Sequence, residues 1–236
     1  MPGSPTTGKD LRRLPPFLSM RVKLCGMTRV EDAREAARLG AWAVGLIHHA
    51  DSPRRVDPAV AAEIGAELRR RVEVVGVFVN APLDDLVKAA EDESLTMIQL
   101  HGDEGPAFCQ EAARRTGCGI IKATRVRSAA DIQAAEAFRT DFHLFDAFRP
   151  GTPGGTGDSF DWELLRQRSS AIPGILSGGL TPLNVAEAIS VANPAAVDVA
   201  TGVESEPGIK DPELMADFIR QVQLSAPSID IPESAA

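Results

Sequence analysis

Two residues of the sequence could exchange protons with a substrate, because each stands at the end of a short apolar run. Cys25 ends the run 21–25, and Asp146 ends the run 141–146. A thiol, whose ordinary pKa is about 8.5, acts as a general base only where its neighbours favour the thiolate. A carboxyl group with apolar neighbours tends to have a raised pKa, as a general acid near neutrality requires. The pair is therefore a candidate base and a candidate acid.

Both residues also have simpler interpretations. A cysteine in an apolar run is more often a small buried hydrophobic residue than a catalytic group. Asp146 could instead form a salt bridge with Lys23 or Arg149. The residue types alone do not decide between these interpretations and the chemical one.

Two further side chains could bind a polar substrate. Arg54, in the motif Ser52-Pro53-Arg54, follows the apolar run 41–47. The planar fork of arginine suits a carboxylate, although an arginine in a loop is often only solvated. His101 follows the run 95–100 and could be either a substrate ligand or a histidine whose hydrogen bonds are satisfied within the protein.

Glycines cluster after three late apolar runs and could form a phosphate site. They lie in Gly154-Gly155-Thr156-Gly157, in Gly178-Gly179 and at Gly202. Glycine lets backbone N–H groups approach an anion closely, and a short helix near Gly202 would add its positive end. Tight turns alone would also use glycine, but three neighbouring loops favour phosphate binding.

The apolar runs alternate with segments of helical periodicity along the chain. Eight runs are candidate strands, at 21–25, 41–47, 72–79, 95–100, 119–123, 141–146, 172–176 and 196–200. Most are nearly continuous apolar stretches, as expected for parallel strands covered by helices. Helix-start signals lie between them, either as a capping box or as an N-cap residue followed by proline. They are Thr28 with Glu31, Ser128 with Asp131, Asp57-Pro58, Thr181-Pro182 and Asp211-Pro212.

Eight strand-then-helix units in single file favour an α/β fold of one domain, a closed (β/α)₈ or TIM barrel. The alternative, an open doubly wound sheet, would usually carry a glycine fingerprint after its first strand. The chain has Gly26-Met27-Thr28-Arg29 there instead. Because the active site of such a barrel lies at the carboxyl ends of its strands, the candidate residues would meet at one mouth.

We expect residues 21–223 to form the barrel, between a disordered N-terminal extension (1–20) and a disordered C-terminal tail (224–236). The chain has 236 residues, of which 44% are hydrophobic, enough for one core of this kind. A net charge of −8 argues against nucleic acid as a partner, because it repels phosphate backbones.

The three cysteines have neither metal-site nor disulfide-framework spacing, which indicates free thiols in a reducing compartment. The apolar stretches are far shorter than the roughly 20 residues that a membrane span needs, and the N-terminus lacks the apolar core of a signal peptide. We expect a cytoplasmic protein, a monomer or homodimer, with no membrane partner and no metal site.

A series of motifs along the chain resembles, in the same order, those of the phosphoribosylanthranilate isomerase family. They are KLCGMT at 23–28, SPR at 52–54, VGVF at 75–78, QLHG at 99–102, Asp146, GGTG at 154–157, FDW at 160–162, LSGGL at 176–180 and DVATGVE at 198–204. Together they cover nearly all of the chain that is expected to fold. The family's usual serine before Gly202 is Thr201 here, which keeps the hydroxyl.

The resemblance implies an Amadori rearrangement of N-(5-phosphoribosyl)anthranilate in tryptophan biosynthesis, without cofactor or metal. Asp146 would protonate the furanose ring oxygen, and Cys25 would remove the C2′ proton. Arg54 matches the arginine that pairs with the anthranilate carboxylate. The glycine loops and Thr201 would hold the phosphate of this small-molecule substrate, and His101 and Asp198 match positions near the site.

Two other functions remain open at this point. The related phosphoribosyl isomerase of histidine biosynthesis runs the same chemistry on a two-phosphate substrate, with single or dual specificity. That family resembles a duplicated half-barrel, and no clear match exists between residues 21–120 and 121–222. A non-catalytic sensor of phosphate ligands would bind product without turnover, because fold alone does not determine function.

Overall fold

The computed structural model describes residues 20–146 and 162–225. Eight parallel strands form a closed barrel in the order β1 to β8, and each strand pairs with its neighbours in the chain. The strands are β1 (Arg21–Cys25), β2 (Ala43–Ile47), β3 (Glu73–Phe78), β4 (Met97–Leu100), β5 (Gly119–Arg125), β6 (Phe142–Asp146), β7 (Gly174–Ser177) and β8 (Ala196–Val199). The pairing of β8 with β1 closes the ring, which confirms the predicted single-domain barrel and excludes the open sheet.

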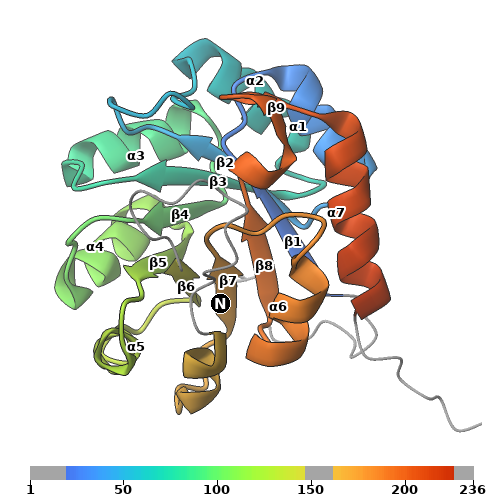
Figure 1. The fold of residues 1–236 in the computed structure, drawn as a ribbon. Helices are drawn as coiled ribbons and strands as arrows, with labels where there is room; N and C mark the ends of the chain where they lie inside the picture. The colour runs from blue at the N-terminus through green and yellow to red at the C-terminus, as the bar shows by residue number, and fades with distance from the viewer. Residues whose placement is uncertain (1–19, 147–161, 226–236) are drawn as a thin grey trace, which may run out of the picture.

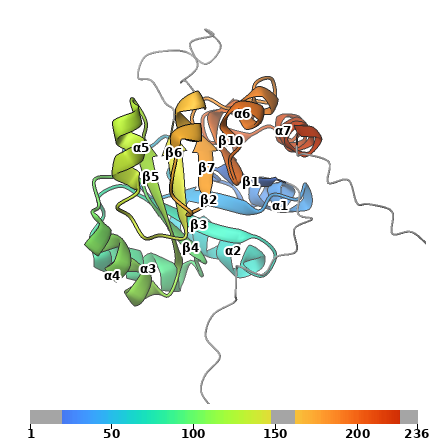
Figure 2. The same cartoon turned by 90° about the horizontal axis from the view of Figure 1, so that it is seen from below.

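Helices surround the strands on the outside, as Figures 1 and 2 show. They are α1 (Val30–Arg38), α2 (Pro58–Leu68), α3 (Leu83–Asp92), α4 (Pro106–Thr116), α5 (Ala129–Ala135), α6 (Val185–Ala192) and α7 (Pro212–Ser225). A 3₁₀ helix, η1 (Trp162–Gln167), stands between β6 and β7. A second short one, η2 (Thr201–Val203), leads from β8 into the small hairpin of β9 (Glu204–Glu206) and β10 (Ile209–Lys210).

Three of the five predicted helix starts are confirmed. The Asp57 carboxylate accepts a hydrogen bond from the backbone N–H of Ala59 at 2.8 Å, at the start of α2. Ser128 and Asp131 form the predicted capping box of α5. At α7, Asp211 accepts hydrogen bonds from the backbone of the first turn.

The other two predicted starts are wrong: a tertiary contact occupies the Thr28 hydroxyl, whereas local hydrogen bonds form a turn after Thr181. The hydroxyl of Thr28 donates to the carbonyl of Gly208, and α1 begins after Arg29 without a side-chain cap. Thr181 begins a turn rather than a helix, since α6 starts only after Asn184. The Asn184 side chain instead accepts the backbone N–H of Thr181 at 2.8 Å.

The core has two layers, separated by the strands. Apolar side chains inside the barrel come from alternate positions of the strands, among them Ala43, Val75, Ile121, Leu144 and Ile175. The opposite faces of the strands pack against the helices in a larger cluster. Because side chains alternate along a strand, the inward positions toward the carboxyl ends hold the polar residues of the site. They are Lys23, Cys25, Gln99, Asp146, Ser177 and Asp198.

No helix among residues 20–146 and 162–225 is long and apolar enough to cross a membrane.

Candidate active site

A buried ion pair joins β1 to β8 at the base of the mouth. The ammonium of Lys23 lies 2.7 Å from a carboxylate oxygen of Asp198, and the hydroxyl of Ser177 donates to the other oxygen at 2.9 Å. The side chain of Lys23 is fully buried. Burial alone would lower the pKa of Lys23, but attraction and hydrogen bonding to Asp198 outweigh it, so the pKa lies above its ordinary value. The predicted site residue Asp198 is therefore paired with a buried lysine.

Cys25 lies inside the barrel against the backbone of the neighbouring strand. A Cβ atom at Gly45, its partner in β2, would lie 2.6 Å from the Cys25 sulfur, so only glycine leaves room for the thiol. Burial raises the pKa of Cys25, although the nearby Lys23 lowers it in part. The thiol is thus protonated in the free protein at neutral pH, with a cation beside it that would stabilise a thiolate.

We expect the thiolate absorbance of Cys25 to appear only at alkaline pH. In an ultraviolet titration, the difference between wild type and Cys25→Ser should stay flat through neutrality. It should rise only above the ordinary thiol pKa of about 8.5, because burial disfavours the charged form. Cys109 and Cys118 remain in both proteins, so their absorbance cancels. A thiolate signal at neutral pH would show instead that Lys23 outweighs burial.

Asp146 and His101 face one another from β6 and the end of β4. Nε2 of His101 lies 3.2 Å from a carboxylate oxygen of Asp146, and the amide nitrogen of Gln99 lies 3.3 Å from Nδ1 of the same ring. A Gln99 amide that donates to Nδ1 leaves the ring proton on Nε2, directed at Asp146. The possible bridge from Asp146 to Lys23 is not formed, since Lys23 binds Asp198, and Arg149 lies outside the described residues.

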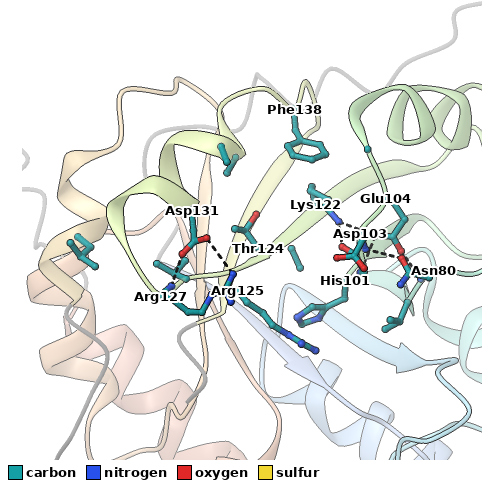
Figure 3. A pocket seen from close by; sticks show the side chains of 18 residues that line it. Asn80, His101, Asp103, Glu104, Lys122, Thr124, Arg125, Arg127, Asp131 and Phe138 are labelled. Atoms are coloured by element: carbon teal, nitrogen blue, oxygen red, sulfur yellow. Dashed lines mark hydrogen bonds and ion pairs between the residues drawn. The ribbon is translucent and has the colours of Figure 1, made fainter. Parts of the chain in front are cut away.

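The loop that carries His101 is fastened by a second buried ion pair. Glu104 accepts the backbone N–H groups of Asn80 and Gly102, and Lys122 of β5 binds the same carboxylate at 2.8 Å. These residues line one side of a cavity of about 930 Å³, which His101 also lines. Figure 3 shows Lys122, Glu104 and Asn80 side by side near His101. The cavity opens between the carboxyl ends of β4 and β5 and helix α5.

Arg54 follows β2 and is bound by a buried glutamate. Its Nε and Nη2 atoms donate to the two carboxylate oxygens of Glu204, at 2.8 to 3.0 Å. The same carboxylate accepts the ammonium of the buried Lys210 at 2.9 Å. Arg54 is thus a fixed cation at the rim of the mouth.

The loops after β7 and β8 approach each other closely at the predicted glycines. Gly178 and Gly179 both have positive φ, at 93° and 66°, which other residues rarely adopt. A Cβ atom at Gly202 would lie 2.0 Å from the carbonyl oxygen of Leu180. The predicted helix near Gly202 is the single turn η2, which begins at Thr201. Gly154, Gly155 and Thr156 lie outside the described residues.

Sequence reasoning missed the residues that position the predicted ones. Lys23 and Gln99 could have been found from strand alternation, because each lies two residues before a predicted site residue and so faces the same side. Glu204 and Lys210 carry no such local signal, since their roles depend on contacts with the distant loop of Arg54.

The mouth therefore brings together a thiol, a carboxylate beside a histidine, a fixed arginine and two glycine loops. These groups can protonate one atom, accept a proton from another, and bind anions at two places. Among the described residues, no group of three His, Cys, Asp or Glu side chains could hold a metal ion.

Comparisons with known proteins agree on one family. The family model of N-(5′-phosphoribosyl)anthranilate isomerase matches residues 22–221. An isomerase of that name from Geobacter metallireducens is 44% identical over 204 residues, which cover 86% of this chain and 99% of the relative. The crystal structure of phosphoribosyl anthranilate isomerase from Thermotoga maritima has a TM-score of 0.80 and 40% identity, over 86% of this chain and 98% of that one.

A further crystal structure contains a bound ligand. It is a phosphoribosyl anthranilate isomerase in complex with reduced 1-(o-carboxyphenylamino)-1-deoxyribulose 5-phosphate, with 37% identity and a TM-score of 0.75. It covers 86% of this chain, and this chain covers 98% of it.

Proposed function

Since the chain belongs to the phosphoribosylanthranilate isomerase family and converts N-(5-phosphoribosyl)anthranilate to 1-(2-carboxyphenylamino)-1-deoxyribulose 5-phosphate in tryptophan biosynthesis, we propose that Asp146 is its general acid and Cys25 its general base. The observation that carries this assignment is their placement. Each is the last residue of its strand, and both occupy inward positions of the barrel. Substrate held between β1 and β6 would meet one group on either side.

In the first step, the carboxyl group of Asp146 protonates the furanose ring oxygen. The bond from C1′ to that oxygen breaks while the anilinic nitrogen donates its electron pair, which gives an open-chain iminium ion. The thiolate of Cys25 then removes the C2′ proton, and the electrons of that bond neutralise the iminium nitrogen. The resulting enolamine tautomerises to the ketone, so that no proton is gained or lost overall.

The raised pKa of Cys25 has two opposite effects on this step. It lowers the fraction of thiolate at neutral pH, but it also makes each thiolate a stronger base. Lys23 would stabilise the thiolate form when the proton leaves. Loss of turnover with retained product binding in Cys25→Ser and Asp146→Asn tests both roles.

The two anionic ends of the substrate would fix its position between the acid and the base. We assign the carboxylate to Arg54, and the phosphate to the loops of Gly178, Gly179, Thr201 and Gly202, with Gly154, Gly155 and Thr156. His101 would orient the carboxyl group of Asp146, and Asp198 would hold Lys23 beside Cys25. The close approach of the loops after β7 and β8 supports the phosphate assignment.

Gly202→Ala is expected to weaken phosphate binding, because the added methyl group would force the two loops apart. Overpacking costs typically about 1–3 kcal/mol, and to the extent that this cost falls on the phosphate-binding arrangement of the loops, the KM for substrate would rise by up to roughly 5- to 150-fold. Inhibition by ribose 5-phosphate should weaken in parallel. Gly105→Ala is the matched control, since nothing lies within 4 Å of its added Cβ. An unchanged KM in Gly202→Ala would remove this loop from the phosphate site.

We also propose an oligomeric state and a cellular location for this chain. A relative from Thermotoga maritima is described as dimeric, and we propose that this chain is a monomer or a homodimer. Three free cysteines suit the reducing cytoplasm. Sedimentation at several concentrations would distinguish the two assembly states.

A further inference from the structure

The contact between Arg54 and Glu204 uses only one edge of the guanidinium group. A guanidinium has two edges that can bind a carboxylate with two hydrogen bonds, one formed by Nε with Nη2 and the other by Nη1 with Nη2. Glu204 occupies the Nε edge, through contacts of Nε at 2.8 and 3.0 Å and of Nη2 at 2.8 Å. The Nη1 edge is therefore turned away from Glu204.

Glu204 is itself a fixed anion. Its side chain is only 3% exposed, and the buried ammonium of Lys210 donates to it at 2.9 Å and to the carbonyl of Ala200 at 3.0 Å. Burial would raise the pKa of Glu204, but the hydrogen bonds from Arg54 and Lys210 outweigh it and hold the pKa below its ordinary value. The carboxylate is thus charged at neutral pH and cannot rotate freely.

The two basic side chains around Glu204 differ in charge and exposure. Two basic side chains, Arg54 and Lys210, share one carboxylate, and burial lowers the pKa of Lys210 whereas Arg54 keeps its charge. Lys210 is fully buried, whereas the Arg54 side chain is 19% exposed, so positive charge is presented to a ligand through Arg54. A second carboxylate could bind there without having to displace the first.

The aliphatic part of the Arg54 side chain is held in place as well as its guanidinium group. A Cβ atom at Gly26 would lie 2.9 Å from Cδ of Arg54, and Gly26 has a φ of 79° that favours glycine. Arg54 therefore passes directly over the residue that follows Cys25. An error in the orientation of its guanidinium would move a bound carboxylate relative to the candidate base.

We propose that Glu204 is a positioning residue that sets the specificity of the site for substrates with an aromatic carboxylate. It holds the Nε edge of Arg54, so that the Nη1 edge faces the substrate at a fixed distance from Cys25. The inference rests on the proposed role of Arg54 as the carboxylate ligand. Glu204 acts through Arg54 and does not itself touch the substrate.

The test compares two stable ligands that differ only in the carboxylate. One is reduced 1-(o-carboxyphenylamino)-1-deoxyribulose 5-phosphate, and the other is its phenylamino counterpart without the carboxyl group. We expect Glu204→Gln to weaken binding of the first by about tenfold, the cost of one weakened charged contact, and to leave the second within about twofold. KM should rise for the natural substrate while kcat changes little. Glu206→Gln, an exposed change in the same hairpin, should leave both dissociation constants unchanged.

Binding of the ligand without a carboxyl group also shows that the variant is folded. If Glu204→Gln does not fold, Glu204→Asp keeps the charge for Lys210 but withdraws it from Arg54, and the same loss of selectivity is expected. Equal weakening of both ligands would show a merely structural role and overturn the inference. So would an unchanged preference for the carboxylate.

Arg54→Ala separates this inference from the role on which it rests. Loss of the carboxylate preference in Arg54→Ala, together with its retention in Glu204→Gln, would overturn the role of Glu204 alone. Retention of the preference in Arg54→Ala would overturn the role of Arg54 itself, and the inference with it.

Discussion

Asp146→Asn is expected to lower kcat for N-(5-phosphoribosyl)anthranilate by roughly 10²- to 10⁴-fold, the usual contribution of a positioned general acid. The asparagine has the same shape and can still accept the N–H of His101, which lies 3.2 Å from the carboxylate in the wild type. It cannot, however, deliver a proton to the ring oxygen. Loss of substrate fluorescence measures the rate, and the dissociation constant of the product should change only a few-fold.

A matched control makes the same substitution, aspartate to asparagine, at another residue of the same mouth. Asp103 is exposed and lines the cavity beside His101, so Asp103→Asn should retain activity within about twofold if only local chemistry matters. Activity within tenfold of wild type in Asp146→Asn would mean that another group supplies the proton. His101 would then be the next candidate, because its Nε2 lies 3.2 Å from the Asp146 carboxylate.

The barrel could be predicted because each strand is specified locally. Every strand of the barrel overlaps a predicted apolar run, and β1 (Arg21–Cys25) coincides with its run. Parallel strands covered by helices need apolar residues on both faces, and this requirement is visible in a short window of sequence. The ends of the strands also located Cys25 and Asp146, since the mouth of a barrel collects the last residue of each strand.

The partners of the site residues could not be predicted in the same way. Lys23 could have paired with Asp146 or Asp198 as far as the sequence shows, and it pairs with Asp198, 175 residues away. The choice follows from register, because Lys23 lies opposite Asp198 where β8 closes the barrel against β1. Register between the first and last strands is a property of the closed ring and has no local signal.

The failed helix start at Thr28 has a similar cause. Thr28 and Glu31 have the spacing of a capping box, but the Thr28 hydroxyl donates to the carbonyl of Gly208, 180 residues away. Local propensity was outweighed by a contact that fastens the β9–β10 hairpin near the mouth. That hairpin carries Glu204 and Lys210, so the departure from the local rule lies beside the proposed site, where such departures are expected.

Lys23→Met is expected to lower the free energy of unfolding by about 3–5 kcal/mol, because it leaves the Asp198 carboxylate buried without its cation. The side chains of the pair are 0% and 7% exposed, so water cannot replace the lost partner. The pKa of Lys23 is raised in the folded state, so its stabilising effect is complete below the unfolded value of about 10.4 and is lost as the pH rises through the folded value. Urea unfolding near neutral pH should therefore show the full difference.

The control is a lysine of the same chemistry at the surface. Lys88 pairs with Asp92 one turn along α3, with side chains that are 76% and 57% exposed, and Lys88→Met should lower the free energy of unfolding far less than Lys23→Met. Removing both buried charges in Lys23→Met/Asp198→Leu should recover part of the loss, since the cost comes from the unpaired carboxylate. If Lys23→Met were no less stable than Lys88→Met, Asp198 would have taken up a proton or found another cation. Its role in holding Lys23 beside the Cys25 thiol would then have no energetic support.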